Sequence, residues 1–290
     1  MSFVEGPVTV RVPASSANLG PGYDSLGLAL GLHDEISARA ADRLTIHVDG
    51  EGHGTVPLDE SHLVVRAMHA AFDLMAETPP GLDLRCTNRI PHGRGLGSSS
   101  AAIVGGIHLA RALVDGGDDR LDDASAFQLA VDLEGHPDNV AAAQFGGLTI
   151  AWIEGAAAEV ERLDTDVAVT VFVPTQVVAT ETARGLLPAS VPHADAAANS
   201  GRAALLVAAL TGAPHRLISA TEDRLHQSYR SAAMPDSYQL VRRLRLDGVP
   251  AVISGAGPTV LAFTRGVADL APDGWLSHEL DVDPDGVVVV

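Results

Sequence analysis

The stretch PHGRGLGSSSAA, residues Pro91 to Ala102, decides how the rest of the chain is interpreted. It holds three glycines and three serines between two apolar runs. Pro91 ends a strand-like segment, the glycines permit left-handed backbone and close approach of a ligand, and the serines stand where a helix begins. The unpaired N–H groups and the positive dipole end of such a helix favour an anion such as a di- or triphosphate. A plain Gly/Ser connector with a serine cap is the alternative.

Composition bounds the class of protein. The chain has 290 residues, of which 46% are hydrophobic, enough to build a large core in two closely packed domains. A formal net charge of −18 disfavours a nucleic-acid partner, because such proteins usually concentrate positive charge on one face. All 19 basic residues are arginine. Without lysine, the chain can form no Schiff base or pyridoxal phosphate linkage, no Walker A loop and no lysine-dependent protein-kinase site.

The sequence also predicts where the protein works. The single cysteine, Cys86, cannot form an internal disulfide, which favours a reducing compartment. The N-terminal segment MSFVEGPVTVRV lacks the basic start and long apolar centre of a signal peptide, and no apolar run approaches the roughly 18 residues of a membrane span. We expect a cytoplasmic protein with no membrane partner.

Apolar patterning predicts alternating strands and helices without sequence repeats. The expected strands are Val8–Val12, Leu44–Val48, Leu82–Cys86, Leu148–Ile153, Ala168–Val173, Ala251–Ile253 and Val260–Phe263. A helix is expected after Ser100, where an apolar stripe recurs every three to four residues, and others at Asp123–Leu133, Ala197–Leu210 and Asp236–Leu246. The polar, alanine-rich stretch EGAAAEVERLD, Glu154 to Asp164, is the expected boundary between domains 1–160 and 161–290.

Four motifs carry a family resemblance. PHGRGLGSSSAA resembles the phosphate-binding motif of the GHMP kinase superfamily, and ISGAGPTVLAF, Ile253 to Phe263, is similar to its glycine-rich third motif. VPASSANLGPGYDSLGLAL, Val12 to Leu30, and EGHPDNVAAAQFGG, Glu134 to Gly147, resemble the homoserine kinase branch. The motifs span nearly the whole chain in the right order. Two departures are Tyr23, where phenylalanine is frequent, and Ser100, where alanine is usual.

The resemblance implies a fold and a reaction. The fold is α+β, a two-domain GHMP kinase fold with a ribosomal S5 domain 2-like N-terminal domain and a ferredoxin-like C-terminal domain. The reaction is ATP plus L-homoserine giving ADP and O-phospho-L-homoserine, a step toward threonine, with Mg²⁺ as cofactor and a homodimer by family analogy. One alternative is another GHMP small-molecule kinase with a mevalonate-type acceptor. The other is a catalytically inactive member that binds nucleotide or an amino acid.

In-line phosphoryl transfer requires held phosphates, a bridging divalent cation and a placed acceptor hydroxyl. By resemblance, the phosphates are held by Pro91, Gly93, Arg94, Gly95, Leu96, Gly97, Ser98, Ser99, Ser100 and Ala101. Ser99, with Ser98 as the second choice, and Glu134 are expected to ligate Mg²⁺, which prefers oxygen donors. From the residues alone, an exposed carboxylate near a helix end is the favoured interpretation of Glu134, and only the motif context reverses it. The resemblance also brings the third-motif loop, Ser254 to Thr259, against the phosphate loop across the domain interface.

Homoserine is a zwitterion, so its pocket needs a carboxylate for the ammonium and a cation for the carboxylate. Asp24 is the candidate for the ammonium, and Arg184 and Arg230 are candidates for the carboxylate. A turn or cap role for the aspartate and solvated positions for the arginines are the alternatives.

The family pattern adds further polar residues to this pocket. It implicates Asn18 and Thr180 in binding substrate, places His136 in the homoserine pocket and puts Asn139 near the transferring phosphate. Asn18, His136 and Asn139 form the expected catalytic set. No general base is assigned. Asp138 lies nearby, but we expect catalysis by positioning and by charge stabilisation from Mg²⁺ and the loop amides.

Overall fold

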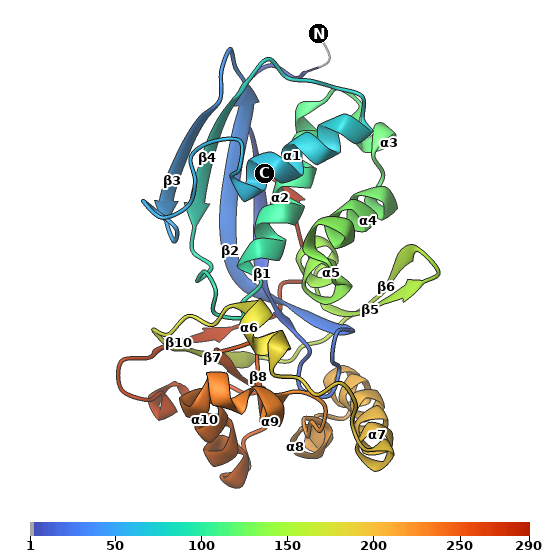
Figure 1. The fold of residues 1–290 in the computed structure, drawn as a ribbon, viewed down its shortest axis with the longest axis vertical. Helices are drawn as coiled ribbons and strands as arrows, with labels where there is room; N and C mark the ends of the chain where they lie inside the picture. Colours follow the sequence, from blue (N-terminus) through green and yellow to red (C-terminus); the bar gives the residue numbers. More distant parts are fainter. Residues whose placement is uncertain (1–2) are drawn as a thin grey trace.

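Two sheets organise the computed structural model, which describes residues 3–290 (Figure 1). The larger sheet has seven strands in the order β11-β1-β2-β4-β3, with β5 pairing β2 and β6 pairing β5. The smaller sheet has four, in the order β10-β7-β9-β8. Strand bounds in the larger sheet are β1 Val8–Ala17, β2 Leu26–Ala40, β3 Thr45–Gly50, β4 Leu82–Asn88, β5 Leu148–Glu154, β6 Ala157–Leu163 and β11 Val288–Val289. Those in the smaller sheet are β7 Val169–Val173, β8 Ala251–Ile253, β9 Val260–Ala262 and β10 Leu276–Leu280.

Helices cover one face of the larger sheet and leave the other to solvent (Figure 1). Along β4, Leu82, Leu84 and Cys86 are buried while Arg85 and Thr87 are exposed, the period-2 pattern of a sheet with one packed face. The covering helices are α1 Leu63–Leu74, α2 Ser98–Leu113, α4 Asp123–Glu134 and α5 Pro137–Phe145, with the short α3 Gly117–Arg120 between α2 and α4. Helix α2 packs centrally, and its Ile103 and Ile107 are fully enclosed in the main core. The glycine-rich loop before α2 is thereby fixed to a helix packed in the main core.

The smaller sheet carries its own core. Phe172 on β7 and Val260 on β9 pack with Leu244 of helix α10, and all three are fully buried. The helices of this half are α6 Thr180–Gly185, α7 His193–Thr211, α8 Leu217–Ala220, α9 Gln227–Arg230 and α10 Pro235–Leu246, with 3₁₀ turns η1 Pro214–Arg216, η2 Ser231–Ala233 and η3 Ala268–Leu270. Helix α6 lies where the two halves meet (Figure 1).

The predicted strands and helices are all present, with ends shifted by a few residues, and the α+β fold is confirmed. The patterning did not reveal the strands β2, β6, β10 and β11, or the helices α1, α3, α5, α6, α8 and α9. EGAAAEVERLD forms the turn and second strand of the β5–β6 hairpin, not a linker. The change of sheet falls at residues 164–168, and the C-terminal β11 returns to pair with β1. The division into 1–160 and 161–290 stays a prediction; its first two residues lie outside the described part of the chain, and the sheets favour a slightly later junction.

Of the helices among residues 3–290, none combines the length and apolar character needed to cross a bilayer.

Candidate active site

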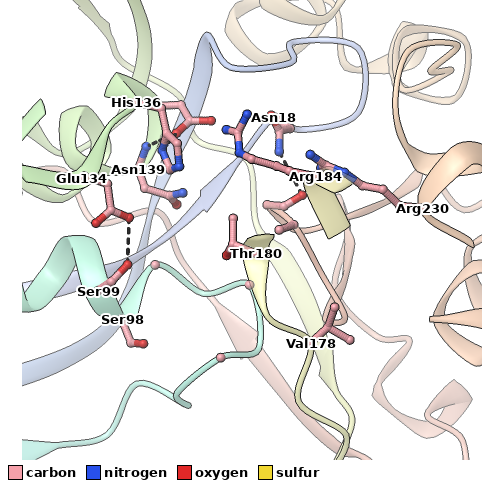
Figure 2. A pocket seen from close by; sticks show the side chains of 16 residues that line it. Asn18, Ser98, Ser99, Glu134, His136, Asn139, Val178, Thr180, Arg184 and Arg230 are labelled. Carbon is pink, nitrogen blue, oxygen red and sulfur yellow. Dashed lines mark hydrogen bonds and ion pairs between the residues drawn. The ribbon is translucent and has the colours of Figure 1, made fainter. Parts of the chain in front are cut away.

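A cavity of about 240 Å³ lies between the two halves of the molecule. Helices α2, α5 and α6 and two glycine-rich loops meet there. It brings together most of the predicted site residues: Asn18, Gly93, Gly95, Gly97, Ser98, Ser99, Glu134, His136, Asn139, Thr180, Arg184 and Arg230. Figure 2 shows Ser98, Ser99 and Glu134 on one side, and Arg184 and Arg230 on the other. The two ends of the cavity therefore carry different chemical groups.

The first end is the phosphate loop. Gly93, Gly95 and Gly97 have φ of 64°, 77° and 70°, the left-handed region that favours glycine. A Cβ at Gly97 would overlap the hydroxyl of Ser15, and one at Gly95 would overlap the carbonyl oxygen of Ser254. Gly97 is the residue before α2, and no described side chain caps that helix. The first N–H groups of α2 are therefore available to an anion, as the sequence predicted.

The third motif contacts this loop directly. Ser254 Oγ donates to the carbonyl of Gly95 at 2.6 Å. Thr259 N–H donates to the carbonyl of Arg94 at 3.2 Å, and Asn18 Nδ2 donates to the carbonyl of Gly255 at 2.9 Å. Residues from both halves thus hold the loop in place.

Several predicted phosphate-loop residues do not line the cavity with their side chains. Pro91, Leu96, Ser100 and Ala101 are buried in the supporting core. Arg94 turns aside: its Nε donates to the carbonyl of Pro174 at 3.0 Å and its Nη2 to that of Thr175 at 3.3 Å. Arg94 therefore ties the loop to the segment after β7, and its guanidinium is not among the groups that line the cavity.

Glu134 ends helix α4 and reaches the start of α2. Its Oε1 accepts hydrogen bonds from Ser99 Oγ at 2.8 Å and from Ser100 Oγ at 3.0 Å, whereas no bond joins it to Ser98 within the described residues. Hydroxyl and carboxylate oxygens are suitable ligands for Mg²⁺. Residues 3–290 contain no cluster of three His, Cys, Asp or Glu side chains able to hold a metal ion.

His136 and Asn139 flank the start of helix α5. Asp138, only 2% exposed, accepts the N–H of Asn139 at 2.8 Å and lies 3.4 Å from His136 Nδ1. Its carboxylate raises the pKa of His136 above the usual value. Asn139 Oδ1 accepts from Ser15 Oγ at 2.9 Å, which orients the amide. Asp138 thus supports two cavity residues at once.

The other end of the cavity holds an ion pair. Arg184 contacts Asp24 with two bonds, Nη2–Oδ1 at 2.8 Å and Nη1–Oδ2 at 3.2 Å, and its Nη1 donates to the Tyr23 hydroxyl at 3.1 Å. Asp24 has φ of 53°, and its N–H donates to Asn18 Oδ1 at 2.9 Å. Asp24 is not among the residues that line the cavity. The groups expected to take opposite ends of a zwitterion are therefore paired with each other.

Arg230 is in a different situation. It is 2% exposed, its Cζ lies 5.4 Å from the centroid of the Tyr23 ring, and its buried Nε has no partner among the described residues. No carboxylate in residues 3–290 forms an ion pair with it, and Asp24 and Asp223 act only from longer range. Burial lowers the pKa of Arg230, but arginine stays charged at neutral pH. A buried, unpaired cation beside a cavity attracts an anion.

The sequence did not reveal a second cavity, of about 270 Å³, which shares Ser98 and Ser99 with the first. Val56, Leu63 and Cys86 give it an apolar wall. His62 also lines it; its Nδ1 is buried without a described partner, and burial lowers its pKa. Helix α1 was not predicted from the sequence, and only the tertiary fold sets its start beside the phosphate loop.

Comparisons with known proteins agree with this geometry. Residues 62–147 match the family model described as GHMP kinases N terminal domain. A homoserine kinase of Streptomyces avermitilis is 58% identical over 100% of this chain and 97% of its own length, and one of Streptomyces coelicolor is 57% identical over 100% and 96%. The solved homoserine kinase of Cytophaga hutchinsonii matches with a TM-score of 0.82 at 24% identity, over 100% of this chain and 99% of its own. The chain belongs to the homoserine kinases of the GHMP kinase family.

Proposed function

We propose that the protein transfers the γ-phosphoryl group of ATP to the side-chain hydroxyl of L-homoserine, giving ADP and O-phospho-L-homoserine. The observation that carries this proposal is Arg230, a buried guanidinium that has no carboxylate partner among residues 3–290 and faces the same cavity as a phosphate loop. An acceptor that brings its own carboxylate satisfies that charge, whereas a neutral sugar does not.

For the nucleotide, the glycines and the first turn of α2 would hold the phosphates. The apolar cavity beside Ser98 and Ser99 would take the base, because a purine ring needs a flat apolar space adjoining the phosphate site. Ser99 and Glu134 would hold Mg²⁺, which when bound neutralises charge on the phosphates, and the buried Ser100 would orient the Glu134 carboxylate.

For the acceptor, Arg184 and Arg230 would bind the carboxylate, and Asp24 would bind the ammonium. The Arg184–Asp24 pair supports this assignment, since a zwitterion can join it by offering a cation to one partner and an anion to the other. Asn18, Thr180 and His136 line the space between the arginines and the phosphate loop, where the acceptor hydroxyl must lie. Asn139 would sit near the transferring phosphate.

The chemical step rests on positioning and on charge stabilisation by the loop amides. Asp138 is enclosed and already occupied by the backbone of Asn139 and the ring of His136, which favours a supporting role. Replacing Asp138 with asparagine separates the two roles. A fall in turnover of several orders of magnitude, with folding and ATP binding intact, would identify a true base and overturn the positioning mechanism.

The direct test is ADP release from Mg·ATP with L-homoserine, D-homoserine, L-serine, L-threonine, mevalonate and galactose. We expect fast turnover with L-homoserine alone. Faster turnover with mevalonate would support the rival acceptor class, and Asp24→Asn would then leave acceptor affinity unchanged. Saturable binding without ADP would favour a catalytically inactive member. We also propose a homodimer; sedimentation showing a monomer at working concentration would contradict it.

A further inference from the structure

A fully buried histidine, His226, lies behind the substrate end of the cavity. It directly precedes α9, the short helix whose last residue is Arg230. Its ring contacts that of Tyr23, with centroids 5.2 Å apart and planes tilted by 36°. His226 does not line the cavity, and the proposed reaction assigns it no role.

The hydrogen bonds of His226 fix its tautomer. Nε2 lies 2.8 Å from the carbonyl oxygen of Gly20, which can only accept, so Nε2 carries the proton. Nδ1 lies 3.3 Å from Arg230 Nη1, which can only donate, so Nδ1 presents a lone pair. Only the neutral ring satisfies both contacts, and burial lowers the pKa of His226 in the same direction.

A neutral acceptor has a specific effect on Arg230. It orients the guanidinium but leaves its charge uncompensated, whereas a carboxylate in the same place would form an ion pair and compete with the substrate. The nearest carboxylate to the imidazole is that of Asp223, whose Oδ1 is 3.8 Å from Nε2 and accepts the N–H of Leu225. Its Oδ2 accepts the N–H groups of His226 and Gln227. Figure 2 shows the guanidinium of Arg230 directed toward Arg184 and Asn18.

We propose that His226 is a positioning residue that orients Arg230 toward the carboxylate of the substrate while leaving the positive charge of Arg230 uncompensated. This inference rests on the proposed function, because it requires an acceptor with a carboxylate. It also links the loop that carries Asp24 to the helix that carries Arg230, through the Gly20 carbonyl.

Two substitutions separate the hydrogen bonds of the ring. In His226→Gln, the side-chain amide can still donate to Gly20 from near the position of Nε2, but no acceptor remains near Arg230. In His226→Asn, Oδ1 stands near the position of Nδ1 and can still accept from Arg230, but the donor to Gly20 is lost. His215→Gln is the matched control, since His215 is exposed at the surface of the second half.

We expect His226→Gln to raise the KM for L-homoserine by about 10- to 100-fold, the effect of losing one hydrogen bond to a charged group. The KM for ATP should change less than about twofold, because the phosphate loop is untouched. His226→Asn should keep the KM for L-homoserine near the wild-type value and lose thermal stability instead. For 3-aminopropan-1-ol, which is homoserine without its carboxylate, kcat/KM should be equal in the wild type and His226→Gln.

The inference is overturned if His226→Gln keeps the wild-type KM for L-homoserine, or if it lowers kcat/KM equally for both acceptors. Should the variants not fold, nitrogen-15 NMR of the wild-type histidines provides the test. A doubly protonated His226 ring between about pH 6 and 8 would contradict the neutral tautomer. If the wild type itself does not phosphorylate L-homoserine, the proposed function fails first; if it does and only the His226 results disagree, the inference alone fails.

Discussion

Replacing Arg230 with methionine should weaken substrate binding strongly while leaving the fold almost intact. In the free protein, Arg230 is a buried charge without an ion-pair partner in the described part of the chain, so a methionine of similar length removes an unfavourable burial. Against this gain stand the loss of the contact with the Tyr23 ring and the orphaned Nδ1 of His226. These effects oppose one another, and we expect the free energy of unfolding to change by less than about 1 kcal/mol.

Binding of the substrate carboxylate has no such compensation. Truncating one partner of a buried, hydrogen-bonded charge pair costs about 2–5 kcal/mol, which corresponds to a loss of roughly 30- to 5,000-fold in kcat/KM for L-homoserine. The assay is steady-state ADP release at varied homoserine and saturating ATP, with thermal unfolding measured on the same preparations. Arg216→Met, at an exposed arginine, is the control and should change neither quantity.

Two results would refute this reasoning. An Arg230→Met variant with an unchanged KM for homoserine would show that the guanidinium does not bind the carboxylate. A variant destabilised by more than about 2 kcal/mol would show that Arg230 is a structural cation with a compensating partner.

Three further outcomes are expected. Gly97→Ala should destabilise the protein or abolish ATP binding in calorimetry, because φ is 70° and the new Cβ would overlap Ser15. The control Gly201→Ala, in an open position of helix α7, should stabilise the protein by about 0.5–1 kcal/mol. Cys86 is 2% exposed and burial raises its pKa to about 12, so a thiol reagent should label it slowly in native protein and fast in denaturant; fast native labelling would contradict the buried position. Burial alone would raise the pKa of Asp283, but the bond to His33 at 2.6 Å and the amides of Gly286 and Asp285 hold the pKa below its usual value. The ionised Asp283 therefore stabilises the folded protein above about pH 4, and this stabilisation is lost as pH falls through the lowered pKa. The stability difference between wild type and Asp283→Asn should therefore shrink on acidification, and a difference that grew would have the wrong sign.

How far the sequence predicts this molecule depends on the range of the interactions involved. Strands such as Ala251–Ile253 and the apolar stripe of α2 follow from local patterning, and glycine spacing predicts an anion loop before α2. The 15-residue strand β2 was not predicted, because only its pairing with several neighbours makes LGLALGLHDEISARA a single strand. Motif resemblance found Asp24 and Arg184 separately, but not that they form an ion pair across 160 residues. No sequence pattern singled out His226, because the role we infer for it depends on two hydrogen bonds that exist only after folding.

The loop from Asn18 to Asp24 is strained and is held by contacts from the second half of the chain. Asn18, Leu19 and Asp24 adopt φ of 65°, 49° and 53°, and each non-glycine residue in this region costs roughly 1 kcal/mol. Asn18 offsets part of that cost within the loop by accepting the N–H of Asp24. Further restraints come from the second half: Asn18 donates to Gly255, His226 binds Gly20, and Arg184 binds Asp24. Without these contacts the strained conformation has too little to hold it, so we expect Asp24, Arg184 and Arg230 to become ordered together, when the two halves dock.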